Sequence, residues 1–194
     1  MGWRGAGGSG ASDVGAYFFF GGLLMILGSI GEWIIGNTFP FVVFGTFGAF
    51  WLTFGATLTP FFNVYGAFAP AGQPAAAGLL SPTFNASFAF FLLFMAVLCF
   101  LYFILSLRTN VVFALIFFTL IIGFCCLAGA YWQIANAING GATAPPPLAG
   151  KLLVVAGAFT FITDLCGWWI FFAIMLAALD FPFQLPGMLF RICC

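Results

Sequence analysis

Residues 111–130 read VVFALIFFTLIIGFCCLAGA, a run of twenty residues that contains no charged side chain. An α-helix needs about 20 apolar residues to cross the hydrocarbon core of a bilayer, which is about 30 Å thick. A strand of a membrane β-barrel would instead alternate polar and apolar residues, and this run does not alternate. Residues 111–130 therefore predict a transmembrane helix.

The composition of the whole chain agrees with this prediction. Of its 194 residues, 64% are hydrophobic and 4% are charged, and the mean hydropathy is +1.22. A water-soluble domain of this length cannot bury that much apolar surface. The expected surroundings are a lipid bilayer. A formal net charge of zero and the lack of a basic run give no indication of nucleic acid as a partner.

Five apolar stretches predict five helices, separated by segments rich in turn-forming residues such as Gly36–Pro40. The predicted order is a flexible tail at 1–14, a transmembrane bundle at 15–186 and a C-terminal tail at 187–194. Within the bundle, the helices are expected at 15–35, 40–62, 86–107, 111–138 and 152–179, with a Pro/Gly/Ala-rich loop at 63–85. Because lipid offers no hydrogen-bond partner to bare backbone, the predicted fold class is an all-α, polytopic transmembrane helix bundle.

The residues that usually perform catalysis are largely missing. The chain has no histidine, and its six cysteines do not follow the spacing of a metal site. No nucleophile-plus-base arrangement and no phosphate-binding loop is recognisable. We therefore expect no enzyme activity, no metal and no cofactor. The sequon Asn85-Ala86-Ser87 is expected in the long loop, but it lies so near the helix at 86–107 that glycosylation at Asn85 stays open.

Two carboxylates lie within predicted helices. Asp164 is near the middle of the helix at 152–179, where an aspartate costs about 2.5–3.5 kcal/mol on the insertion scale. We expect it to face the bundle or water rather than lipid, either as a proton or substrate site or as a hydrogen-bonded structural acid. Glu32 lies near the end of the helix at 15–35, where an interfacial role is favoured. With no histidine, Asp164 and Glu32 are the candidates for proton coupling.

Residues 32–51, EWIIGNTFPFVVFGTFGAFW, closely resemble the acetate uptake transporter family. This family contains bacterial acetate/succinate permeases and fungal acetate permeases, which are also described as ammonia exporters. Its motif turn falls on Asn37, Thr38 and Phe39. The segments 107–110, 127–132 and 171–186 extend the resemblance over about residues 15–186.

The resemblance implies a six-helix protomer with its own pore, assembled as a homo-hexamer in the plasma membrane. It also implies transport of acetate and similar small monocarboxylates, often together with a proton. The constriction of the family maps onto Phe47, where relatives usually have tyrosine, and onto Leu120. A ring of apolar side chains disfavours hydrated ions, so a solute would pass in a protonated or dehydrated form.

Two departures from the family pattern bear on activity. The family's first helix, with its NPAPLGL motif, has no counterpart in residues 1–14, and the segment after Pro186 differs as well. Five helices are therefore expected instead of six, with the N-terminus outside and Arg108 on the cytoplasmic side. Three functions remain open: a proton-linked monocarboxylate permease, a channel for ammonia or another small neutral solute, and a non-transporting subunit that modulates intact paralogues.

Overall fold

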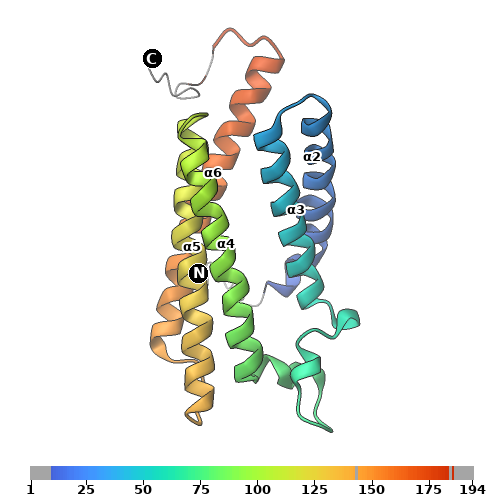
Figure 1. Cartoon of the computed structure of the whole chain (residues 1–194), viewed down its shortest axis with the longest axis vertical. Coiled ribbons are helices and arrows are strands. Elements are labelled where there is room, and N and C mark those ends of the chain that lie inside the picture. Colours follow the sequence, from blue (N-terminus) through green and yellow to red (C-terminus); the bar gives the residue numbers. More distant parts are fainter. Residues whose placement is uncertain (1–9, 143, 184, 186–194) are drawn as a thin grey trace. The chain divides into compact units, whose positions relative to one another are not determined.

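The structure, a computed structural model, describes residues 10–142, 144–183 and 185. These residues are mainly helical and include no β-strand. Among them, five helical segments are long and apolar enough to cross a membrane: Ala11–Ile34, Thr38–Leu58, Pro82–Ser106, Val111–Asn139 and Pro147–Ala178 (Figure 1). The predicted all-α transmembrane fold is confirmed, and the chain is an integral, multi-pass membrane protein.

The first of these segments joins several kinds of helix. It begins with the 3-10 turn Ala11–Asp13 and α1 (Val14–Ala16), continues as the π-helix η3 (Tyr17–Leu24), and ends as α2 (Met25–Ile34). It starts four residues before the predicted position 15. Asp13 lies in its first turn, where a carboxylate interacts favourably with the positive end of the helix dipole. The rest of the predicted tail, residues 1–9, lies outside the described residues.

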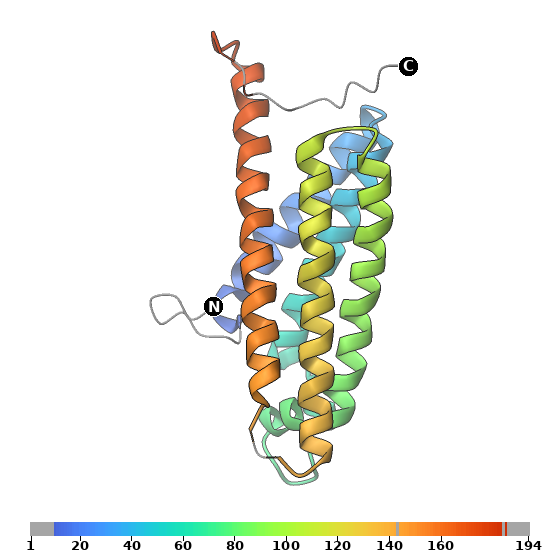
Figure 2. The same ribbon diagram turned by 90° about the vertical axis from the view of Figure 1, so that its left-hand side faces the viewer.

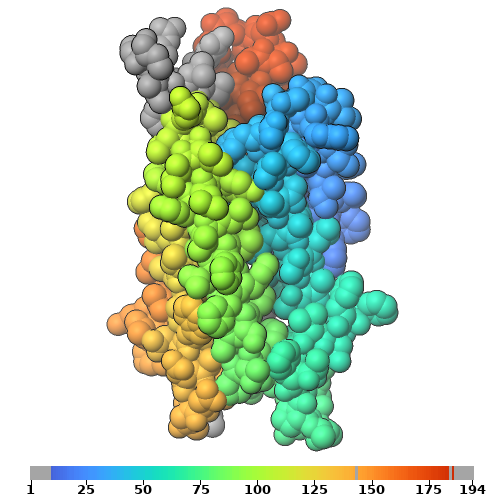
Figure 3. Space-filling view, in the orientation of Figure 1, coloured from blue at the N-terminus to red at the C-terminus, as the bar shows by residue number. Residues whose placement is uncertain are grey.

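A tight turn connects α2 to α3 (Thr38–Leu58), which runs antiparallel to it (Figure 1). The hydroxyl of Ser29 on α2 is buried and donates a hydrogen bond to the carbonyl of Phe41 on α3 at 2.8 Å. After α3, the connection contains the short 3-10 helices Pro60–Phe62, Gly66–Phe68 and Ala75–Leu80. Figure 3 shows this connection as a knob of packed side chains beyond the end of α3.

The remaining long helices are α4 (Pro82–Ser106), α5 (Val111–Asn139) and α6 (Pro147–Ala178). Asn110 caps α5, because its side-chain oxygen accepts a hydrogen bond from the backbone N–H of Val112 at 2.7 Å. Both α4 and α6 start earlier than predicted, at Pro82 rather than 86 and at Pro147 rather than 152. Proline suits the first turn of a helix, since the N–H it lacks would have no helical partner there.

Two compact units make up the chain: an N-terminal unit that ends at Phe84 and a C-terminal unit that starts at Asn85. Within the C-terminal unit, α5 lies between α4 and α6 and runs antiparallel to both (Figure 2). Ring contacts join α4 to α5, as between Tyr102 and Phe117, whose centroids are 5.4 Å apart. These three helices form one layer, which we call the α4–α5–α6 layer.

Candidate functional site

Glu32 and Asn37 fix the turn between α2 and α3. The backbone N–H of Asn37 donates to the carbonyl of Glu32 at 2.8 Å, and its side-chain amide donates to Oε2 of Glu32 at 2.7 Å. Gly36 has a φ of +84°, a left-handed conformation that glycine adopts without steric cost. The carboxylate of Glu32, which the sequence places near the end of this helix, is therefore engaged in holding the turn.

The other two motif residues begin the next helix. Thr38 is the first residue of α3 and is exposed, and Phe39 follows it half-buried. The chain can enter α3 at once because the N–H of Phe41 donates to the carbonyl of Asn37 at 3.0 Å. In the structure, the motif turn thus connects α2 to α3 and fixes the geometry of the turn between them.

Phe47, the predicted gate residue on α3, belongs to a continuous row of aromatic rings. Its side chain is 8% exposed and meets Phe50 edge-on, with 6.5 Å between ring centroids. Phe50 contacts Trp51 and stacks on Phe54, and Tyr17 of the π-helix stacks on Trp51 at 5.2 Å. Such ring pairs contribute beyond the apolar area they bury. The row holds Phe47 in place from one side.

Two adjacent glycines allow the π-helix to approach α3 closely. A Cβ added to Gly21 would lie 2.5 Å from Cγ of Trp51, and one added to Gly22 would collide with the end of the Leu52 side chain. One added to Gly48 would lie 2.8 Å from Cγ1 of Ile26. Small residues at such crossings let membrane helices pack through their backbones. The Gly21-Gly22 pair was not predicted from the sequence, where its signal was two neighbouring glycines inside an apolar helix.

Leu120, the second predicted gate residue, lies half-buried on α5, next to a hydrogen bond between helices. Oγ1 of the buried Thr119 and Oγ1 of Thr163 on α6 are 2.7 Å apart. One turn further along, Cγ2 of Thr160 would be 3.3 Å from a Cβ added to Gly123. The helices α5 and α6 are thus joined by polar and close apolar contacts around Leu120. The pairing of these two threonines was not predicted from the sequence.

Asp164 follows Thr163 on α6, and its side chain is exposed within this chain. Among the described residues, none donates a hydrogen bond to its carboxylate. Lys151, on the same helix, is 13 residues away, which corresponds to about 20 Å along the axis and is too far for an ion pair. An uncompensated carboxylate on an apolar helix does not face lipid. Its face of α6 must therefore meet water, a solute or further protein.

The predicted site residues divide between the two units. Glu32, Asn37 and Phe47 lie in the N-terminal unit, on the α2–α3 hairpin. Leu120 and Asp164 lie in the C-terminal unit, on neighbouring helices. The structure therefore joins Glu32 to Asn37 directly, places Phe47 further along α3, and puts Leu120 and Asp164 on the adjacent helices α5 and α6.

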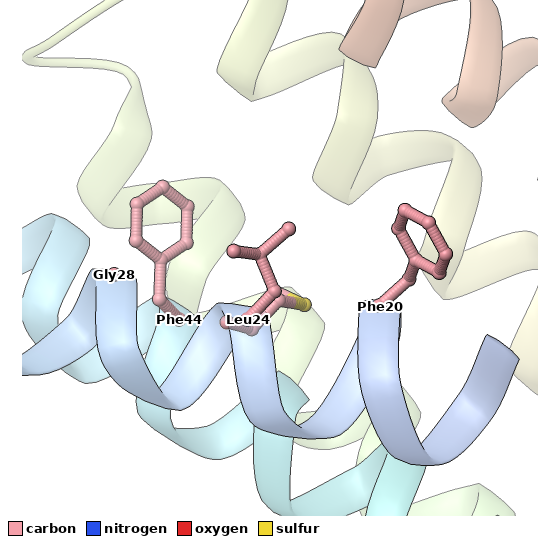
Figure 4. A pocket seen from close by; sticks show the side chains of 5 residues that line it. Phe20, Leu24, Gly28 and Phe44 are labelled. Carbon is pink, nitrogen blue, oxygen red and sulfur yellow. The ribbon is translucent and has the colours of Figure 1, made fainter. Parts of the chain in front are cut away.

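An open apolar depression of about 190 Å³ lies on the surface of the N-terminal unit (Figure 4). Phe20, Leu24, Met25 and Gly28 line it from the first helical segment, and Phe44 lines it from α3. Binding sites for small polar ligands need a few convergent polar groups to orient the ligand. The depression has an apolar lining, so it lacks the groups that would hold a carboxylate.

Two further expectations concern metal binding and glycosylation. Within the part of the chain that the structure describes, no group of three or more His, Cys, Asp and Glu side chains is placed to hold a metal ion. Asn85 does not lie in a loop, as the sequence suggested. It belongs to the first turn of α4 and is only 3% exposed, because α4 starts at Pro82.

Comparison with known proteins supplies the family. The model of the GPR1/FUN34/yaaH family matches residues 11–191. The chain belongs to the GPR1/FUN34/yaaH family. This confirms the resemblance that residues 32–51 carry. No solved structure matches the chain.

Some of the proteins that are similar to this chain have names that refer to transport. Protein alcS of Aspergillus fumigatus is 42% identical over 186 residues, which cover 96% of this chain and 66% of alcS. Acetate transporter protein patA of Aspergillus clavatus is 34% identical, over 95% of this chain and 68% of its own length. Ammonia transport outward protein 2 of Saccharomyces cerevisiae is 30% identical over 59% of this chain and 38% of its length. This chain thus spans about two thirds of alcS, and the names indicate transporters rather than enzymes.

Proposed function

We propose that this protein transports acetate and similar small monocarboxylates across the membrane, linked to proton movement. The observation that carries the proposal is family membership over residues 11–191, together with 34% identity to a relative named as an acetate transporter. Five apolar helices that can span a bilayer provide the scaffold that such transport requires.

Phe47 and Leu120 are proposed to form the narrow part of the path. Phe47 is supported by its row of rings, and Leu120 lies beside the bond that joins α5 to α6. A constriction of phenyl and isobutyl groups offers no hydrogen bond to replace the hydration shell of an ion. The protonated form, acetic acid, is neutral. It therefore passes such a constriction at a lower free-energy cost than the hydrated acetate anion.

Asp164 is the proposed proton-coupling residue, and Glu32 is the weaker candidate. The carboxylate of Glu32 already binds the amide of Asn37 at 2.7 Å. No described residue donates a hydrogen bond to Asp164, so its carboxyl group can exchange a proton without breaking the fold. Exposed carboxyl groups in membrane helices mark proton and substrate paths in many transporters.

We further propose a homo-oligomer, a hexamer by resemblance to the family, in the plasma membrane. Large apolar side chains on α2 and α4, such as Trp33 and Phe94, are 65% and 66% exposed. These faces suit contact with lipid or with a second copy of the chain. Cross-linking of the membrane-embedded protein, followed by mass determination, would reveal the number of subunits.

Uptake of radiolabelled acetate at acid external pH tests the main proposal. Cells or proteoliposomes containing the chain should take up acetate faster than matched empty controls, and unlabelled propionate should compete. A protonophore should reduce the uptake. No uptake, alongside an active full-length relative in the same assay, would contradict the proposal.

A second candidate function is passage of ammonia, which the name of the yeast relative favours. Ammonia flux that neither saturates nor responds to carboxylate competitors would support this alternative. If the chain moves neither solute alone but co-purifies with a full-length relative and changes its activity, it is a modulating subunit. The three outcomes are separated by one panel of flux and co-purification measurements.

A further inference from the structure

The hydroxyl pair of Thr119 and Thr163 is the starting point of a further inference, which rests on the proposed transport function. Their oxygens are 2.7 Å apart, and each hydroxyl also lies near a carbonyl of its own helix, Leu115 at 2.9 Å for Thr119 and Phe159 at 3.1 Å for Thr163. One hydroxyl donates across to α6 or α5 while the other donates within its helix, so both protons are used. The pair is therefore a satisfied polar link within an otherwise apolar contact.

The residues that come directly after this pair are Leu120 and Asp164. In an α-helix the next residue is rotated by about 100° and displaced by about 1.5 Å. Because α5 and α6 run antiparallel, both rotations turn toward the same side of the plane that contains the two axes. Leu120 and Asp164 therefore lie on one face of the α4–α5–α6 layer, with about 3 Å between their levels along the axes.

The residues that precede the pair, Phe118 and Ile162, fall on the opposite face by the same construction. Both are apolar and are 46% and 39% exposed, which suits contact with lipid. The face with Asp164 cannot be the lipid face, because a carboxylate is costly there. Leu120 consequently shares the face that is turned away from lipid.

We propose that the Thr119–Thr163 hydroxyl pair fixes the register of α5 and α6, so that the gate residue Leu120 and the carboxylate of Asp164 line one solute path at nearly the same depth. Thr119 and Thr163 are positioning residues, which act through their neighbours Leu120 and Asp164. The substrate class is that of the proposed function, a small monocarboxylic acid.

The shared face can be tested without measuring transport. Four single variants, Leu120→Cys, Asp164→Cys, Phe118→Cys and Ile162→Cys, are treated in membranes with a small water-soluble methanethiosulfonate. Modification is read by mass spectrometry of the peptide that carries each new cysteine, so the native cysteines stay in place. Only a thiolate in contact with water reacts.

We expect the cysteines at 120 and 164 to react faster than those at 118 and 162 by roughly tenfold or more. Equal or faster reaction at 118 and 162 would overturn the proposal, and so would reaction at only one of 120 and 164. This result is obtained whether or not acetate is the transported solute. Failure of the proposed function and failure of the shared face are thus distinguishable.

The role of the hydroxyl pair is tested by Thr119→Val and Thr163→Val, with Thr→Ser at both positions as the conservative change. Thr160→Val is the matched control, because the hydroxyl of Thr160 donates to the carbonyls of Ala156 and Gly157 within α6 and to no other described residue. The readout is the ratio of kcat/KM for acetate to that for butyrate. In an active transporter, a valine at 119 or 163 should lower this ratio roughly threefold, while the serine variants and Thr160→Val keep it.

A double-variant comparison separates positioning from general destabilisation. In a Leu120→Ala background, adding Thr163→Val should change the ratio less than it does in the wild type, because one of the two residues that the pair positions is already gone. A wild-type ratio in the valine variants, or an equal loss in the serine variants, would overturn the positioning role. If the wild type transports no acetate, the thiol-labelling experiment is repeated with Thr119→Val or Thr163→Val added to each cysteine variant. Loss of the faster reaction at positions 120 and 164 supports the positioning role, and an unchanged difference in reaction rate refutes it.

Discussion

Replacing Gly21 with alanine should destabilise the protein through one contact that the structure defines. The added Cβ would lie 2.5 Å from Cγ of Trp51 and 2.8 Å from its Cβ and Cδ1, whereas carbon atoms normally pack at about 3.5–4.0 Å. Trp51 cannot swing away easily, because Tyr17 stacks on it and Phe50 meets its edge. Overpacking of this kind costs about 1–3 kcal/mol, and we expect the upper part of that range.

Two other glycines of the same helical segment provide a graded comparison. A Cβ on Gly22 would collide with Cδ2 of Leu52 and would lie 2.7 Å from Cγ of Leu52 and 3.2 Å from the backbone oxygen of Tyr17, so its cost should be similar to that at Gly21. A Cβ on Gly31 would have no atom within 4 Å, so Gly31→Ala should be neutral or stabilising by up to about 1 kcal/mol. The expected order is therefore that Gly21→Ala and Gly22→Ala both destabilise the protein more than Gly31→Ala does.

Thermal unfolding of the purified protein in one detergent, followed by tryptophan fluorescence, measures this order. For a chain of this size, 1 kcal/mol corresponds to about 2–4 °C in Tm, so Gly21→Ala should lower Tm by at least about 4 °C. The reasoning would be refuted if Gly21→Ala and Gly31→Ala had the same Tm. An unchanged Tm for Gly21→Ala would show that the π-helix and α3 do not cross this closely.

Three further substitutions have defined outcomes. Gly36→Ala places a side chain at a φ of +84° and should cost about 1–2 kcal/mol in the same thermal assay, with unchanged Tm counting against a left-handed turn. Asn37→Ala removes the amide that binds Glu32 and should cost about 0.5–1.5 kcal/mol of stability. Glu32→Gln keeps a hydrogen-bond acceptor and should cost less. A larger loss in Glu32→Gln would show that the charge of Glu32, and not the hydrogen bond, holds the turn. Asp164→Asn cannot exchange a proton, so it should reduce saturable acetate uptake at acid pH, and uptake at the wild-type rate would remove Asp164 from the coupling role.

The fold class could be predicted because its cause is visible in the sequence. Long apolar runs such as residues 111–130 leave a membrane helix as the sole structure that satisfies the backbone in lipid. The predicted helix at 111–138 and the observed α5, Val111–Asn139, differ by one residue. The polar corner at Asn110 provides both the break and the cap that define this start.

The predicted starts of α4 and α6 were wrong because proline can either end a helix or begin one. Pro82 and Pro147 stand within segments that read as loops, yet each occupies the first turn of a helix. Proline ends a helix when it lies inside one and suits the beginning of a helix when it lies at N1. The misassignment of Asn85 to a loop is a direct result of the missed start of α4.

The contacts between helices could not be predicted, because in a uniformly apolar helix the sequence hardly distinguishes the inner face from the outer one. Thr119 and Thr163 are 44 residues apart, and nothing in the chain marks them as partners. The π-helix at Tyr17–Leu24 was likewise invisible, since it contains the same residue types as the α-helices around it. Asp164 could be singled out because its charge conflicts with its surroundings.

The wide turns of Tyr17–Leu24 also bear on how length variation is tolerated in this region. A π-helix places more residues in each turn than an α-helix, so a short stretch of it absorbs one surplus residue without shifting the phase of the α-helix after it. A homologue with one residue fewer between positions 17 and 24 would form regular α-helix there. In such a homologue, the same side chains of Met25–Ile34 would still face α3. A one-residue gap in an alignment at this point is therefore compatible with a preserved contact between α2 and α3.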